Sequence, residues 1–274
     1  MTESTEELGR QHLAGCMALV RSASWNQNEA DWRLMLDAGR GWGISLADGT
    51  LAATTLVLPY GDFAWISMVL VLPEHRRKGY ASRLLRTAIA YLEERKLTPI
   101  LDATPAGRTV YLQEGFSDRW GFKRYRADRL VQPELDHRVR QMRETDWPQV
   151  LELDRQAFGA SREPLLRSLY ARRPQAAWLV EGRGHVFGRE GREAGQIGPL
   201  VARDAEAARA LLRTALQTAQ APLYIDVADH SPLHPVIEQA GFTLQRPFTR
   251  MVRGSRPAPG AQDLVHLVAG PELG

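Results

Sequence analysis

The chain has 274 residues, of which 44% are hydrophobic and 24% charged, a composition typical of a soluble globular protein with room for two domains. Its 35 basic and 32 acidic residues leave a net charge of only +3, and the notable basic blocks are short, at 76–78 and 123–126, which argues against nucleic-acid binding. The single cysteine, Cys16, excludes an internal disulfide framework and a cysteine-based zinc site. We expect a cytoplasmic protein that does not bind membranes, because the sequence shows neither a signal-peptide pattern nor an apolar run of about 20 residues.

The first half of the chain alternates helical and strand-like apolar spacing. Asp48-Gly49 is a strong hairpin signal, and Gly61-Asp62 marks a second turn. In chain order we expect helices at 6–22 and 28–38, strands at 42–45, 51–58 and 63–72, a helix at 79–95, a strand at 99–104, a helix at 107–114 and a strand at 120–126.

A linker is expected at 127–136, after which the same order of elements begins again. We expect a strand at 137–142, helices at 145–158 and 161–171, strands at 177–180, 184–187 and 196–202, a helix at 204–219, a strand at 223–227, a helix at 233–240 and the last strands within 243–252. A Pro/Gly-rich break at 256–260 precedes a short apolar tail at 264–269.

Matching residues support an internal repeat. The segment Leu-Leu-Arg-Thr-Ala occurs at 84–88 and again at 211–215, an offset of 127. Gly-Phe at 115–116 recurs at 241–242, an offset of 126, and Asp102 corresponds to Asp226 at an offset of 124. The spacing agrees over three elements, so chance is a weaker explanation than duplication.

The most informative segment joins the strand at 63–72 to the helix at 79–95. A strand ending in Val-Leu-Pro is followed by Glu-His-Arg-Arg-Lys-Gly-Tyr-Ala at 74–81. Backbone N–H groups at the start of a helix, with basic side chains around them, suit a pyrophosphate. Gly79 allows the backbone to approach such a ligand closely. The equivalent segment of the second half, 202–207, has no glycine and carries two acidic residues, which would repel phosphate.

The pattern Arg76-x-x-Gly79-x-Ala81 resembles the acetyl-CoA signature of the GNAT superfamily (Gcn5-related N-acetyltransferases), whose usual form is Gln/Arg-x-x-Gly-x-Gly/Ala. The resemblance implies an α/β (α+β) fold with two tandem GNAT-like domains, each a mixed, mostly antiparallel central sheet flanked by helices. It places a catalytic, acetyl-CoA-binding domain at 1–130 and a degenerate domain at 137–274, as in bacterial tandem-GNAT proteins. Few residues precede position 6, so the family's first strand is expected to be truncated or missing.

By the same resemblance, the strand before the loop holds the pantetheine arm of the cofactor and polarises its thioester carbonyl. The residues expected to bind acetyl-CoA are Val69, Leu70, Val71, Arg76, Arg77, Lys78, Gly79, Tyr80, Ala81, Ser82 and Thr104.

The segment at 104–116 resembles the family's second motif, Asn-x-x-Ala-x-x-x-Tyr-x-x-x-Gly-Phe. Tyr111 falls on the tyrosine that commonly protonates the departing thiolate; the alternative is a core aromatic on an amphipathic helix. Thr104 stands where Asn is usual, and Gly107 stands where Ala is usual. In the second half Ile237 occupies the position that matches Tyr111.

The general base is left open. The central strand at 65–69 has no carboxylate, although its Ser67 is suited to position a water. Asp62, His75 and Asp102 are the nearest titratable residues in the sequence, and each has a plainer interpretation as a turn, loop or strand-end residue. A water chain, or an amine that arrives neutral, is an equal alternative.

Trp25 and Asn26 are candidate substrate residues, because in this superfamily the first two helices line the acceptor side and these residues lie between them. A capped helix start with core tryptophans is an equally good interpretation. His230 and His234 lie near two aspartates but at no recognised metal-ligand spacing, so no metal site is expected.

The expected activity is acetyl-CoA-dependent N-acetylation of a primary amine, on a small molecule or peptide, by direct transfer in a ternary complex. The second domain is expected to wall the acceptor cleft or to mediate contacts. One alternative is a non-catalytic acyl-CoA-binding sensor or interaction protein, and a weaker one is an acyltransferase that uses a longer acyl chain or an alcohol acceptor. A homodimer is left open, and no nucleic-acid partner is expected.

Overall fold

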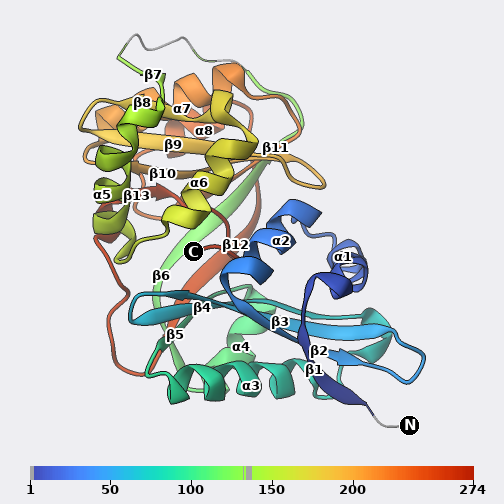
Figure 1. Cartoon of the computed structure of the whole chain (residues 1–274). Coiled ribbons are helices and arrows are strands. Elements are labelled where there is room, and N and C mark those ends of the chain that lie inside the picture. The colour runs from blue at the N-terminus through green and yellow to red at the C-terminus, as the bar shows by residue number, and fades with distance from the viewer. Residues whose placement is uncertain (1–2, 132, 134–137) are drawn as a thin grey trace.

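The expected strands pair into one continuous mixed sheet with helices on both of its faces (Figure 1). The computed structural model describes residues 3–131, 133 and 138–274. Across the sheet the strand order is β1-β2-β3-β4-β5-β12-β6-β11-β13-β10-β9-β8-β7. Neighbouring strands run antiparallel except for β4 with β5 and β10 with β11. Within the described part of the chain, no helix is both long and apolar enough to cross a membrane.

The first half supplies ten of the helices and strands. They are β1 (Ser4–Leu8), α1 (Leu13–Ser22), α2 (Glu29–Ala38), β2 (Arg40–Ser45), β3 (Leu51–Tyr60), β4 (Phe63–Val71), α3 (Tyr80–Glu94), β5 (Thr98–Ala103), α4 (Pro105–Gln113) and β6 (Phe116–Ala127). The second half supplies β7 (Arg140–Gln141), α5 (Trp147–Phe158), α6 (Glu163–Arg172), β8 (Trp178–Val180), β9 (Gly184–Arg189), β10 (Gly195–Ala202), α7 (Ala205–Thr218), β11 (Leu223–Ala228), α8 (His234–Gln239), β12 (Thr243–Arg253) and β13 (Val265–Leu267).

This architecture confirms the predicted fold class. From residue 28 onward each expected helix and strand is present, with its ends moved by a few residues. The strand expected at 137–142 is reduced to Arg140–Gln141, and residues 132 and 134–137 of the expected linker and strand lie outside the described residues.

The start of the chain corrects the prediction. Residues 6–12 are not α-helical: β1 is a strand paired antiparallel with β2, and a short 3-10 helix at Arg10–His12 leads into α1. The family's first strand is therefore present, not missing. Its first four residues, Ser-Thr-Glu-Glu, are polar and largely exposed, as befits an edge strand, so the segment has almost no apolar alternation by which to recognise it.

The repeat is visible in the packing of the two long helices. α3 covers β3 and β4, and α7 covers β9 and β10 in the corresponding arrangement. The two copies of Leu-Leu-Arg-Thr-Ala lie on these helices, where Leu84, Leu85, Leu211 and Leu212 are all fully buried. Their burial at helical spacing is the hydrophobic contribution that fixes each helix on its sheet.

The two halves exchange their long last strands. β6, from the first half, lies between β12 and β11, while β12, from the second half, lies between β5 and β6 (Figure 1). At the centre of the β6–β12 pair Phe122 lies directly opposite Phe248, with the rings stacked at a centroid distance of 5.0 Å. These two positions are 126 residues apart, the offset of the Gly-Phe repeat, so an approximate twofold axis passes between them.

A buried ion pair holds each exchanged strand in the opposite half. Arg124 on β6 donates two hydrogen bonds to Asp226 on β11, at 2.8 and 2.6 Å. Arg250 on β12 donates two to Asp102 on β5, both at 2.9 Å. The four side chains are at most 7% exposed, so each charge depends on its partner for the solvation that burial has removed.

The tail of the second half fills a gap in its own sheet. β10 and β11 pair in parallel at 195–197 and 223–225 and then diverge. β13 occupies the space between them, with Leu267 opposite both Leu200 and Val227. The expected apolar tail at 264–269 is thus a short 3-10 helix followed by a strand of the sheet.

Replacing Arg124 by Met should lower the free energy of unfolding by about 3–5 kcal/mol, because Asp226 would remain buried without its partner. Equilibrium denaturation in urea measures the change. Lys123→Met is the matched control: Lys123 is adjacent on β6, its ion pair with Asp229 is exposed, and its loss should cost less than about 1 kcal/mol. Equal effects of the two substitutions would contradict an anchoring role for the buried pair.

Candidate active site

A V-shaped opening in the first half is the counterpart of the gap that β13 fills in the second. β4 and β5 pair in parallel only at 63–65 and 98–100 and then separate. Beyond this point β4 is irregular: its register against β3 shifts, and Met68 adopts a positive φ of 52°. Thr54 donates a hydrogen bond to the Met68 carbonyl at 2.8 Å, which holds the irregular backbone in place. A conformation this unusual for a non-glycine residue is typical of functional sites.

A cavity of about 300 Å³ lies at this opening. It is lined by residues of β4, α3, β5 and α4, of the loop before α2, of both exchanged strands and of the C-terminal tail. These residues are Trp25, Gln27, Ile66, Ser67, Met68, Val69, Ala81, Leu85, Leu101, Asp102, Thr104, Ala106, Gly107, Val110, Tyr111, Arg124, Arg246, Phe248, Pro271 and Glu272.

The basic loop and the start of α3 adjoin the cavity. Gly79 is the N-cap of α3 with φ +81°, and it leaves open space where a side chain would stand. Arg76, Arg77 and Lys78 are exposed around it, and no side chain caps the helix. The first-turn N–H groups of α3 therefore face outward without an internal acceptor, an arrangement that fits the phosphates of acetyl-CoA.

The other residues predicted to bind acetyl-CoA lie on the cavity wall or on the adjoining parts of β4 and α3. Val69, Ala81 and Thr104 line the cavity, whereas Leu70 and Val71 continue β4 toward the loop, and Tyr80 and Ser82 begin α3. The Tyr80 side chain is buried and bonds Glu3 of the N-terminal segment, so only its backbone is available to a ligand.

The second half lacks such a site within the described residues. At the start of α7 the Asp204 carboxylate accepts a hydrogen bond from the Ala207 N–H at 2.9 Å and pairs with Arg183 at 2.7 Å. The chain's own carboxylate thus occupies the position that an anion would take. With β13 in the gap and Ile237 fully buried, these residues do not fit acetyl-CoA.

Tyr111 lies on α4 and lines the cavity. Burial raises the pKa of its hydroxyl to about 12, so the group keeps its proton at neutral pH. A Cβ added to Gly107 would lie 2.9 Å from the Tyr111 ring, so an alanine at this position would require the ring to shift. Thr104, in place of the usual asparagine, caps α4 by accepting the Gly107 N–H at 3.2 Å.

The two candidate substrate residues are separated by the structure. Trp25 lines the cavity, but Asn26 does not. The Asn26 amide accepts the N–H groups of Glu193 and Ala194 at 2.9 and 3.0 Å and donates to the Ala194 carbonyl at 3.0 Å. Asn26 therefore ties the loop before α2 to the second half, and the next residue, Gln27, reaches the cavity instead.

The lining residues from the exchanged strands and the C-terminal tail were not predicted from the sequence: Arg124, Arg246, Phe248, Pro271 and Glu272. The first three come from the exchanged strands, and the last two follow β13, whose insertion directs the tail back across the first half. Figure 1 shows the C-terminus between the two halves. The Trp65 indole donates to the Pro271 carbonyl, and the Tyr60 hydroxyl to the Leu273 carbonyl, both at 3.1 Å, which fixes the tail against the first half.

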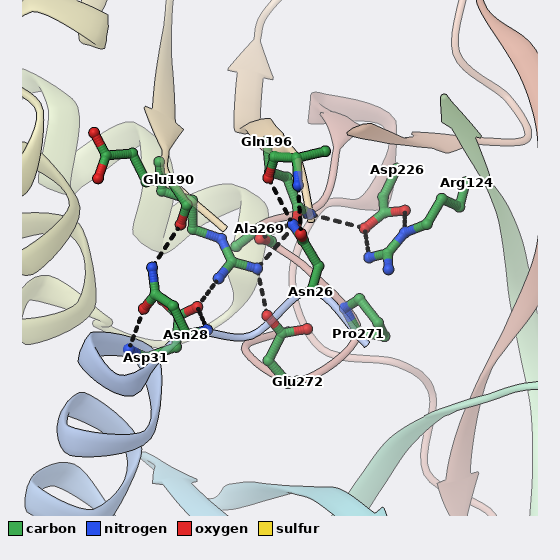
Figure 2. Close-up of polar contacts among 12 residues, drawn as sticks. Asn26, Asn28, Asp31, Arg124, Glu190, Gln196, Asp226, Ala269, Pro271 and Glu272 are labelled. Atoms are coloured by element: carbon green, nitrogen blue, oxygen red, sulfur yellow. Dashed lines mark hydrogen bonds and ion pairs between the residues drawn. The ribbon is translucent and has the colours of Figure 1, made fainter. Parts of the chain in front are cut away.

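A buried polar chain connects the cavity to α2 (Figure 2). Arg189 pairs with Asp31 of α2 at 2.6 Å and with Glu272 of the tail. It also donates to Gln196 at 3.0 Å, and Gln196 donates to Asp226 at 2.9 Å, which is the partner of Arg124. These contacts position Glu272 and Arg124 on the cavity wall from opposite directions.

The candidates for the general base fall in different places. Asp62 is exposed and pairs with Arg256, and His75 lies beside Lys78 on the basic loop. Asp102 lines the cavity but is held by Arg250; burial raises the pKa of Asp102, and the guanidinium opposes that rise. Ser67 lines the cavity too, and among the described residues its buried hydroxyl has no hydrogen-bond partner. The described residues include no group of three or more side chains that could hold a metal ion.

Comparison with known families agrees with this geometry. The model of the acetyltransferase (GNAT) family matches residues 9–116, and the model of the acetyltransferase (GNAT) domain matches residues 150–266. The two matches fall on the two halves of the repeat.

Individual relatives agree as well. The chain is 24% identical over 245 residues to the "Uncharacterized N-acetyltransferase YitH" of Bacillus subtilis (strain 168), with 86% of each protein covered. A putative acetyltransferase from Pyrococcus horikoshii has a similar structure, with a TM-score of 0.83 at 20% identity, covering 99% of this chain and 96% of that one. A tandem GNAT protein from the clavulanic acid biosynthesis pathway gives a TM-score of 0.61 at 15% identity, covering 93% and 100% of the two chains. At these identities the solved structures establish a shared fold.

Replacing Asn26 by Ala should lower the free energy of unfolding by about 1–3 kcal/mol, because the buried Ala194 N–H and the partly buried Glu193 N–H would lose their acceptor. Thermal and urea denaturation measure the loss. Gln11→Ala, the truncation of an exposed amide, is the control and should leave stability nearly unchanged. An Asn26→Ala protein as stable as the control would show that the bonds to residues 193 and 194 contribute little.

Proposed function

Because the chain is a tandem protein of the GNAT acetyltransferase family, we propose that its first half transfers the acetyl group of acetyl-CoA directly to a primary amine of a small molecule or peptide. One observation carries the proposal: the diverging strands β4 and β5, the uncapped start of α3 and the Tyr111 hydroxyl all meet at one cavity. The second half supports it by supplying the far wall of that cavity through Arg246, Phe248 and Glu272.

The chain's own residues fit separate parts of the reaction. When bound, acetyl-CoA supplies an acetyl group on a thioester. The N–H groups at the start of α3, with Arg76 and its basic neighbours, hold phosphate, and the irregular backbone of β4 around Val69 offers groups to the pantetheine arm. Tyr111 holds a proton at its hydroxyl and is placed to give it to a departing sulfur. Ser67 is suited to hold a water that removes the proton of the amine.

We also propose that the two halves have different roles. Only the first half, at 1–130, would bind acetyl-CoA, because Asp204 and β13 fill the corresponding places of the second half, at 137–274. The cytoplasmic location and the homodimer stay predictions.

Calorimetric titration tests the cofactor site. Wild-type protein should bind CoA and acetyl-CoA at a single site, and the double substitution Gly79→Asp with Arg76→Ala should weaken binding by about 100-fold or more. The double substitution places a carboxylate and a side chain at a positive φ beside the phosphates and removes a cation. Gly182→Asp, a glycine of positive φ in an open turn of the second half, is the control and should bind normally. Absence of binding by the wild type would rule out the proposal.

Tyr111→Phe tests the chemistry apart from binding. The phenylalanine ring occupies the same space without the proton, so we expect kcat to fall by about 10²-fold or more while the Kd of acetyl-CoA stays within threefold. Thiol release measured over a panel of amines gives kcat. A Phe variant as active as wild type would contradict the acid role, whereas binding without turnover of any amine would favour the acyl-CoA sensor.

A further inference from the structure

Arg246 is a half-buried cation for which the described residues provide no ion-pair partner. It lies on β12 and lines the cavity, and within the described residues it forms no ion pair. Its Nε is buried and has no hydrogen-bond partner there. Burial, and then the nearby Arg124 guanidinium, lower the pKa of Arg246 from its ordinary value, although arginine stays protonated. A desolvated guanidinium of this kind gains most from an anion that arrives from outside.

The other charges of the cavity wall already have partners. Arg124 is bound by Asp226, Asp102 is bound by Arg250, and Glu272 is bound by Arg189. Asp226 lies close enough to affect Arg246, but Arg124 and Gln196 occupy its oxygens. Among the residues that the structure describes, the wall therefore carries one unbalanced positive charge, at Arg246.

The same wall also offers acceptors without donors. Glu272 and Gln27 are each 2% exposed, and the Oε2 atom of Glu272 and the Oε1 atom of Gln27 have no hydrogen-bond partner among the described residues. The Oε1 atom of Glu272 accepts a hydrogen bond from Arg189, and Figure 2 draws a dashed line to one Glu272 oxygen only. Buried acceptors without donors are costly, and an ammonium group, which has donors only, satisfies them.

The cation at Arg246 suits an anionic end of a ligand, and the acceptors of Glu272 and Gln27 suit a cationic end. On the basis of the acyl transfer proposed above, we propose that the acceptor is an amino acid: a small molecule whose carboxylate binds Arg246 and whose ammonium group binds Glu272 and Gln27. A carboxylate matches the fork of one guanidinium, whereas a phosphate dianion would need a second free cation, which the wall does not provide. The cavity of about 300 Å³ would also hold the acetyl-bearing end of the cofactor, so the acceptor must be small.

Binding of the acceptor can be measured without turnover. Calorimetry is run on the protein alone and on protein saturated with CoA, using the common L-amino acids and the ω-amino acids from glycine to 6-aminohexanoate. Each binder is compared with the amine in which methyl replaces the carboxylate and with the acid that lacks the amine. We expect at least one amino acid to bind about tenfold or more tightly than either analogue, as when 5-aminopentanoate is compared with pentylamine and pentanoate.

Arg246→Gln isolates the carboxylate contact. This side chain has no ion pair to lose, so the variant should fold and bind CoA as the wild type does. Its preference for the amino acid over the amine should fall below threefold. Arg213→Gln removes the same charge from an exposed position on α7 and should keep the full preference. Glu272→Gln should weaken the binding of the amino acid and of the amine to the same extent and leave the binding of the acid unchanged.

Each outcome decides the proposal. An unchanged preference in Arg246→Gln, a wild type that binds amines as tightly as amino acids, or no amino-acid binding to either form of the protein would overturn it. Tighter binding of 2-aminoethyl phosphate than of every amino acid would overturn the choice of carboxylate. CoA binding in the same wild-type preparation shows that the cofactor site stands, so failure of the acceptor proposal is distinguishable from failure of the acetyltransferase proposal.

Discussion

The reciprocal exchange of β6 and β12 is the constraint on which the rest of the structure depends. Each exchanged strand completes the sheet of the other half, and each is held there by a buried arginine–aspartate pair. The pairs contribute to specificity as much as to stability, because a slip in register would leave four charges buried without partners. The exchange also carries Arg124 and Arg246 to the cavity, so this part of the cavity wall exists only when both halves are folded together.

The C-terminal tail contributes to both halves of the structure. As β13 it fills the gap between β10 and β11, which in the first half is the opening between β4 and β5. Beyond β13 the tail returns to that opening and adds Pro271 and Glu272 to its wall. One segment thus fills the opening in one half and lines the cavity in the other. The tail breaks the approximate twofold symmetry of the sheet at these two places.

Local signals in the sequence predicted most of the elements and four residues that line the cavity. Helical and strand periodicity, the turn glycines and the loop at 74–81 all act over short distances, and the structure places Val69, Ala81, Thr104 and Tyr111 on one cavity as expected. β1 was missed because an edge strand of polar residues carries almost no apolar pattern.

The cavity-lining residues of the second half and of β6 were not predicted, for a different reason. They lie on strands that exchange between the halves and on a tail that folds back, and no local sequence pattern encodes either event. One signal was available: Arg124 and Arg250 share the offset of 126 seen for the Gly-Phe repeat, and Asp102 and Asp226 were already matched. Asn26 was predicted to be a substrate residue, but its side chain bonds residues 193 and 194 and so joins the two halves.

The exchanged strands also govern when the protein can finish folding during its synthesis. The partners of the Arg124–Asp226 pair are separated by 102 positions in the chain, and those of the Arg250–Asp102 pair by 148. The neighbour of β5 in the sheet, β12, is synthesised near the end of the chain. Until β11 leaves the ribosome, both edges of β6 lack their partners; until β12 follows, one edge of β5 and one edge of β6 still do, although α3 can already pack on its strands. Unpaired edges are the surfaces on which strands of other chains add. The interval between the synthesis of β6 and that of β12 is therefore the period in which this chain most needs a chaperone.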